Sequence, residues 1–258
     1  MLEPNRVFAF LSMILLVAAI LYNIRLAMRG KDFYVRDIPG LRAIEEFVGR
    51  ATEMGRPVHF SSGVGTLTGA SAPEMFAGLQ VLSYLARLCA RYDTRLIATA
   101  CQPDVFLSTI ETVRQGYVEE GKPEKFKETD VRYLSTNQWA YSAGIIGIVS
   151  REEVAANILI GAFAAETMLL AEASFQAGAT QIAGTTNMYQ LPFFVASCDF
   201  TLIGEEMFAA GAFLSKVPVQ LGSLAGQDFG KAFAVFLVLL GIFSQTLGSD
   251  WLEKLMRL

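Results

Sequence analysis

Residues 57–69 read PVHFSSGVGTLTG, a short apolar run that leads directly into a glycine-rich loop. Pro57 to Ser61 has the length and composition of a buried strand, and a helical pattern follows from about Pro73 to Tyr92. A strand, a glycine-rich turn and a helix in this order are typical of a βα unit. This stretch therefore predicts an α/β fold.

The same alternation continues toward the C-terminus. Leu96 to Ala100 is the next predicted strand, a helix runs from Pro103 to about Glu120, and Val131 to Leu134 is a third strand. Two more strands are expected at Thr180 to Ala183 and Phe200 to Ile203. Further helices are expected at residues 38–55, 190–197 and 205–214. We therefore expect an α/β fold with a mostly parallel sheet flanked by helices.

Two apolar segments, residues 140–148 and 155–175, follow the third strand. Their composition resembles that of a membrane helix, but Glu166 and Glu172 lie in the second segment. A carboxylate near the bilayer centre is costly, which argues against a lipid-facing span. We expect a buried strand and helix here.

An apolar run lies at each end of the chain, Val7 to Ile24 and Ala232 to Leu247. The first approaches the roughly 20 residues that a helix needs to cross a bilayer, and no cleavage site follows it, so an attached transmembrane anchor is expected. The second run becomes polar at residues 244–246, which leaves open whether it spans fully or lies partly in the interface. Pro218 to Lys231, with its three glycines, is expected to be a linker.

The predicted organisation has three parts. Residues 1–31 form an N-terminal transmembrane anchor, 32–226 a cytoplasmic α/β domain, and 227–258 a C-terminal transmembrane helix with an amphipathic tail. The tail carries an apolar stripe that either lies on the membrane or packs on a neighbour: Trp251, Leu252, Leu255 and Leu258.

Charge flanking the first run predicts the orientation in the cell membrane. Arg6 alone precedes the run, whereas four cationic residues follow it: Arg25, Arg29, Lys31 and Arg36. The positive-inside rule therefore predicts that the central domain is cytoplasmic. Three cysteines at unrelated spacings also suit a reducing compartment.

Composition and missing motifs exclude several function classes. A net charge of -4 without a basic stripe argues against nucleic-acid binding. His59 is the only histidine and lies in an apolar strand, so a hydrogen-bonded core histidine is expected and a multi-histidine metal site within one chain is excluded. No zinc, hydrolase or P-loop motif is present, and no cofactor can be named. The expected partners are the lipid bilayer, further copies of the chain and other membrane proteins.

Gly63 and Gly65 open the glycine-rich loop, where backbone amides near a helix N-terminus can bind phosphate. The spacing is GxGxxxG, Pro73 delays the helix, and residues 88–90 hold no ribose-binding acid. The alternative interpretation is a flexible βα turn or an oligomer contact.

Thr185 and Thr186 form a second candidate anion site in a predicted turn, and Glu205 and Glu206 follow the next strand. Acids in apolar sequence can serve as general acid and base or hold a cation such as Mg²⁺; the others here are Glu166, Glu172 and Asp199. The alternatives are helix capping for the threonines and a favourable first-turn position for the glutamates.

Several strings resemble those of a prokaryotic membrane-protein family known only as a domain of unknown function. They are spread over nearly the whole segment between the apolar runs: RDIPGL (36–41), RATEMGRPV (50–58), YDTRLI (92–97), QIAGT (181–185), QLPFFVA (190–196), LIGEE (202–206) and LGSLAGQD (221–228). The resemblance implies membrane association and supplies no activity or catalytic residues.

Two functions from different classes follow. The first is a scaffold whose domain self-associates at the membrane, favoured by the two anchors and by small residues that permit close packing: Gly144, Gly147, Ala155, Gly161, Ala164 and Ala165. The second is a membrane-tethered enzyme or sensor that binds a small anionic, phosphorylated ligand at the carboxyl ends of the strands. Its candidate residues are Gly63, Gly65, Thr185, Thr186, Glu205 and Glu206.

Overall fold

The computed structural model describes residues 7–31, 33, 38–215 and 217–246. The chain divides into two units, one of Asp37–Ser215 and one of Met1–Arg36 with Lys216–Leu258. Arg36 and the predicted C-terminal stripe (Trp251, Leu252, Leu255 and Leu258) lie outside the described residues.

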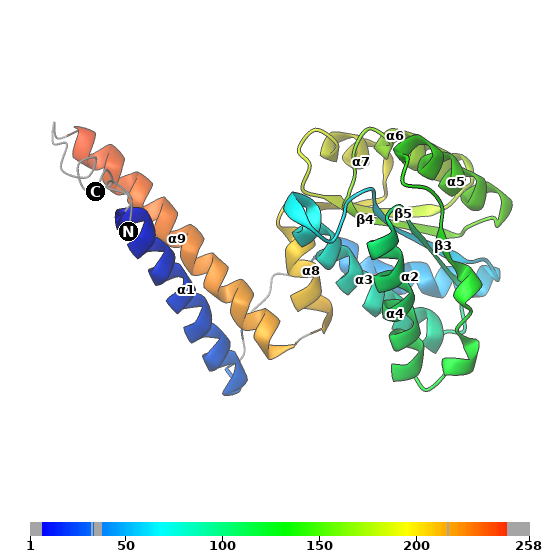
Figure 1. Cartoon of the computed structure of the whole chain (residues 1–258), viewed down its shortest axis with the longest axis horizontal. Coiled ribbons are helices and arrows are strands. Elements are labelled where there is room, and N and C mark those ends of the chain that lie inside the picture. Colours follow the sequence, from blue (N-terminus) through cyan, green and yellow to red (C-terminus); the bar gives the residue numbers. More distant parts are fainter. Residues whose placement is uncertain (1–6, 32, 34–37, 216, 247–258) are drawn as a thin grey trace. The chain divides into compact units, whose positions relative to one another are not determined.

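The unit Asp37–Ser215 is built on a six-stranded sheet in which every neighbouring pair is parallel (Figure 1). The strand order is β3-β2-β1-β4-β5-β6. The strands are β1 (Val58–Gly63), β2 (Leu96–Ala100), β3 (Val131–Tyr133), β4 (Ala156–Ala162), β5 (Thr180–Thr185) and β6 (Phe200–Ile203). The predicted α/β fold with a parallel sheet is confirmed.

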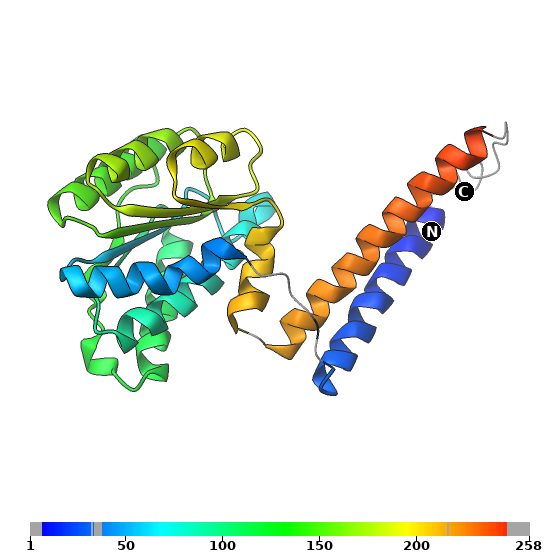
Figure 2. The same cartoon turned by 180° about the vertical axis from the view of Figure 1, so that it is seen from behind.

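Helices cover both faces of this sheet, as Figure 2 shows from behind. The apolar residues of one face pack against α2 (Pro39–Met54), α3 (Ala72–Arg91), α4 (Pro103–Glu119) and α8 (Glu206–Ser215). Those of the other face pack against α5 (Gln138–Arg151), α6 (Thr167–Gln176) and α7 (Leu191–Ser197). This three-layer arrangement explains why β1 and β2 read as continuous buried runs, because a parallel strand covered on both faces has no solvent side.

Helix α2 shows how the sequence pattern sets the layers. Leu41, Ile44 and Phe47 lie on its buried face, whereas Glu45 and Glu46 are exposed. The helix ends where Gly55 adopts φ of 65°, a left-handed conformation that glycine reaches without a Cβ clash.

Three segments differ from the expectation or refine it. The apolar region 140–175 holds the expected buried strand β4 and helix α6, preceded by the additional helix α5. Residues 184 and 185, expected in a turn, belong to β5. The expected linker over Pro218 to Lys231 is wrong, because these residues form the first part of α9 (Pro218–Thr246).

The second unit pairs α9 with α1 (Val7–Met28) in antiparallel orientation (Figure 1). Each helix is long and apolar enough to cross a membrane. Two glycines of α9 allow the two backbones to approach closely: a methyl group on Gly222 would lie 2.6 Å from the Cα of Ile24, and one on Gly226 would lie 2.6 Å from the Cα of Ile20. Small residues spaced four apart are typical of close helix packing in membranes, which explains why glycines occur within this helix.

Candidate functional site

The strand order reverses between β1 and β4, the position at which open α/β sheets most often bind ligands. Strand β1 ends here at Gly63 and strand β4 ends at Ala162. The predicted glycine-rich loop therefore starts at the topological switch point of the sheet.

Glycines at the switch point allow the ends of β1 and β4 to approach each other closely. A Cβ on Gly63, whose φ is 85°, would lie 2.1 Å from the carbonyl oxygen of Ala162. A Cβ on Gly161 would lie equally close to the carbonyl oxygen of Ser62, and one on Gly65 would lie 2.7 Å from the Sδ of Met75. Gly63 and Gly161 thus allow close backbone packing, and Gly65 allows the side chains of Ala162 and Met75 to approach the loop.

The structure brings the second candidate pair near the same loop. Thr186 donates a hydrogen bond to the carboxylate of Glu74, which lies in the first turn of α3. Thr185 is fully buried, and its hydroxyl accepts a hydrogen bond from the amide of Asn187 at 3.2 Å. Thr186 therefore ties the loop after β5 to α3, whereas the hydrogen bond of Thr185 stabilises the start of the loop itself.

Glu205 and Glu206 lie after the edge strand β6, two strands away from β4. The Oε2 atom of Glu206 accepts a hydrogen bond from the amide of Ile203 at 3.1 Å, and this glutamate begins α8. A carboxylate in the first turn of a helix interacts favourably with the helix dipole. This position fits the first-turn interpretation for Glu206, whereas Glu205 immediately precedes the helix.

The other acids have separate surroundings. Glu166 is fully buried; its carboxylate accepts hydrogen bonds from Gln138 Nε2 at 2.5 Å and from the amide of Ala164 at 3.0 Å. Glu172 is exposed, and Asp199 accepts a hydrogen bond from the amide of Gln181 at 2.7 Å. Within the described residues no group of three or more His, Cys, Asp or Glu side chains is placed to hold a metal ion.

A buried polar network crosses the face of the sheet beneath α5 and α6. Because the amide oxygen of Asn157 only accepts, neutral His59 donates from Nδ1 to it at 2.6 Å, and Nε2 accepts from Thr99 at 3.1 Å. The hydroxyl of Tyr141 lies 2.8 Å from Ser61 Oγ and 3.2 Å from Thr99 Oγ1. His59 is therefore the expected hydrogen-bonded core histidine.

Burial controls the protonation of this network and of the cysteines. Desolvation lowers the pKa of His59 to about 4, and its hydrogen bond with Asn157 offsets this only in part. Burial, aided by the charge of Glu166, raises the pKa of the Cys101 thiol to about 11. At neutral pH the histidine is uncharged and the thiol protonated, neither of which suits a reactive nucleophile or an anion ligand.

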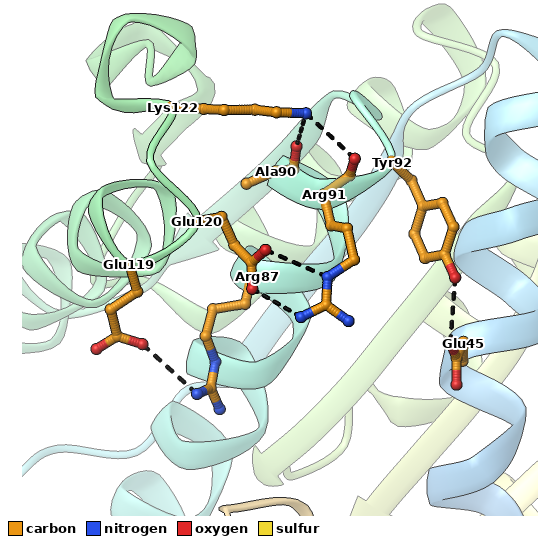
Figure 3. A network of polar contacts seen from close by, with 8 residues as sticks. All are labelled: Glu45, Arg87, Ala90, Arg91, Tyr92, Glu119, Glu120 and Lys122. Atoms are coloured by element: carbon orange, nitrogen blue, oxygen red, sulfur yellow. Dashed lines mark hydrogen bonds and ion pairs between the residues drawn. The ribbon is translucent and has the colours of Figure 1, made fainter.

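Most of the ion pairs among the described residues lie near the amino ends of the strands. Figure 3 shows Lys122 Nζ donating to the carbonyls of Ala90 and Arg91 at the end of α3, and Arg91 making two hydrogen bonds to Glu120. A cation at a helix C-terminus satisfies carbonyls that lack helical partners. This network fastens α3 to the segment after α4.

A cavity of about 240 Å³ lies nearby, in front of the first residues of β2 and β3. Two cations that line it pair with acids of the same lining: Lys125 with Asp93, and Arg95 with Asp130. The cavity is at the edge of the sheet opposite the one where open α/β sheets place their ligands.

An exposed apolar surface on α6, α7 and the loop between β5 and α7 was not foreseen from the sequence. Helices α6 and α7 pack side by side (Figures 1 and 2). Phe175 is 71% exposed and Tyr189 86% exposed. We call this the α6–α7 surface, and its members are Met168, Leu169, Phe175, Met188, Tyr189, Phe193 and Val195.

The stretch of sequence that holds the α6–α7 surface carries charges of one sign only. The sequence contains no lysine or arginine between Arg151 and Lys216, whereas this stretch holds seven Asp and Glu residues. The sequence of α6, TMLLAEASFQ, could have predicted the exposed apolar side chains. Its apolar residues are distributed around the helix rather than along one stripe, so some of them must face outward.

The model of a family described as Domain of unknown function (DUF6754) matches residues 1–256. No curated protein and no solved structure matches the chain. The family gives no catalytic or binding residue against which the candidate positions can be compared.

Proposed function

The chain belongs to the DUF6754 family, and we propose that it is a membrane-anchored protein whose α/β domain self-associates and acts as a scaffold at the cytoplasmic side of the membrane. Support for anchoring comes from α1 and α9, which are long and apolar enough to cross a bilayer. Arg25, Arg29 and Lys31 after the first run support the cytoplasmic side.

The α6–α7 surface is the observation that carries the proposal. Seven large apolar side chains are exposed on these neighbouring elements, and apolar residues exposed together commonly mark interaction sites. Lipid headgroups are an unsuitable partner, because anionic headgroups attract lysine and arginine and the surrounding stretch has neither. A second copy of the chain is suitable, because anchoring holds copies in one plane and raises their effective concentration.

An anionic ligand at the switch point is the second candidate function. The reversal of strand order between β1 and β4 favours it. Two observations weigh against it. Gly63 and Gly161 pack against backbone atoms where β1 and β4 end, and residues 152–215 include no lysine or arginine.

The experiment measures the mass of the full-length protein in mild detergent by mass photometry. We expect oligomers for the natural chain and a shift toward monomer for the double variant Phe175→Asp/Tyr189→Asp. Leu107→Asp is the matched control, since Leu107 is also highly exposed but lies on α4, in the other helix layer. A natural chain that stays monomeric at all concentrations contradicts the proposal.

A thermal-shift screen with nucleotides and phosphorylated metabolites, with and without Mg²⁺, tests the second candidate. The scaffold proposal predicts no shift of the melting temperature. A stabilising compound whose effect is lost in a Thr186→Val variant would favour the ligand-binding function instead.

A further inference from the structure

The contacts between α1 and α9 fix the register of the two helices. They pair Gly222 with Ile24, Gly226 with Ile20, and Gly230 with Leu16. Each step of four residues along α9 thus matches a step of four back along α1. Asp228 therefore lies level with Ala18, and Lys231 with Leu15.

This register gives the depth of Asp228 and Lys231 in the membrane. The run Val7 to Ile24 contains no charged residue, and Arg6 and Arg25 flank it in the sequence, so this run marks the hydrocarbon region. At about 1.5 Å per residue, Asp228 lies about 9 Å and Lys231 about 14 Å below the level of Ile24. The hydrocarbon core is about 30 Å thick, which places Lys231 near its middle.

Both side chains point away from α1. Asp228 is 65% exposed and Lys231 49% exposed, and they form an ion pair at 3.2 Å. Gly226, by contrast, is buried against α1. Charged residues inside a membrane almost always face another helix or a polar cavity rather than lipid. The ion pair on this face of α9 is therefore suited to a contact with another helix within the bilayer.

We propose that this face of α9 is the intramembrane contact with a second copy of the chain, in which Asp228 of each copy pairs with Lys231 of the other. The proposal rests on the proposed function, because it requires a membrane-spanning hairpin that self-associates.

Charge complementarity supports a second copy as the partner. One acid and one base on the same face are self-complementary, as a two-fold interface requires. Side chains on a helix lean toward its N-terminus, so Lys231 reaches toward the level of Asp228 on a parallel neighbouring α9. The contact then holds two acids and two bases and is neutral as a whole.

The test measures energy transfer between differently labelled full-length copies in liposomes. Asp228→Lys leaves only positive charge on the face, and Lys231→Asp leaves only negative charge. We expect each variant to self-associate more weakly by roughly three- to thirtyfold, as polar contacts between membrane helices do when removed.

Mixing the two variants provides the decisive arm, because Asp228→Lys copies complement Lys231→Asp copies. We expect mixed association to recover. An ion pair that only stabilises its own helix cannot be rescued between chains, so lack of recovery overturns the proposal. If a reversed variant fails to insert, Asp228→Asn and Lys231→Gln replace the pair, and recovery on mixing is again expected.

Glu111→Arg is the matched control, since Glu111 forms an exposed ion pair with Arg114 three residues away in α4 and should leave association unchanged. A natural chain without energy transfer at any density overturns the proposed function and this inference together. A natural chain that associates, with reversed variants that associate equally well, overturns this inference alone.

Discussion

Replacing His59 by glutamine removes a group whose protonation opposes folding below neutral pH. The imidazole is fully buried, and burial lowers its pKa from 6.5 to about 4. Glutamine keeps polar atoms that can reach Asn157 and Thr99, but it does not titrate. The variant therefore tests the protonation of the histidine separately from its hydrogen bonds.

The direction of the pH effect on stability follows from which state of the chain binds the proton. Between pH 6.5 and about 4 the unfolded chain takes up a proton that the folded chain excludes, so the natural protein loses stability as the pH falls through this window. The loss between pH 7.5 and 5 is about 2 kcal/mol, and it reaches about 3 kcal/mol below pH 4. For a domain of this size, 2 kcal/mol corresponds to a melting-temperature difference of roughly 4–8 °C.

Thermal unfolding of the full-length protein in mild detergent, followed by circular dichroism at several pH values, measures the effect. We expect the melting temperature of the natural protein to fall more steeply between pH 7.5 and 5 than that of His59→Gln. Carboxylates titrate in both proteins, so their contribution cancels in the comparison. Parallel pH profiles would refute the assignment of His59 as a buried, neutral core group.

Three further substitutions test the packing. Gly226→Leu should separate α1 from α9, whereas Ala234→Leu on an exposed position of α9 should not; hydrogen exchange of α1 amides should speed up only in the first. Gly63→Ala should lower the free energy of unfolding, measured by chemical denaturation, more than Gly69→Ala. Both glycines have positive φ, where an alanine costs roughly 1 kcal/mol or more, but only at Gly63 would the added Cβ meet a backbone oxygen. Lys122→Met should cost about 1–3 kcal/mol by the same measurement, because it leaves α3 carbonyls without their donor.

Local patterns were sufficient for most of the α/β unit. The predicted bounds of β2 and β6 match the structure, because short apolar runs between turn residues are distinctive. The start of α9 was not predicted, because its glycines argue against a helix. Glycine lowers helix propensity, and the value of Gly222 and Gly226 comes from α1, about 200 residues earlier in the chain.

In the candidate site, too, local sequence predicted where elements lie, but long-range contacts decide what the residues do. The sequence predicted a strand ending at Ser61 and a glycine-rich loop from Gly63, whereas β1 continues to Gly63 and the loop begins after it. What Gly63 does depends on its contact with Ala162, and what Thr186 does depends on Glu74, each about 100 residues away. Such pairings follow from strand order, which the alternation of strands and helices does not determine.

Counting copies tests the central claim, self-association at a membrane, most directly. The full-length chain with one fluorescent label is reconstituted in lipid vesicles at low density, and stepwise photobleaching gives the number of copies in each particle. The account predicts two or more steps in most particles, and fewer in the Phe175→Asp/Tyr189→Asp variant. Single-step bleaching of the natural chain at every density, despite correct insertion, would contradict it.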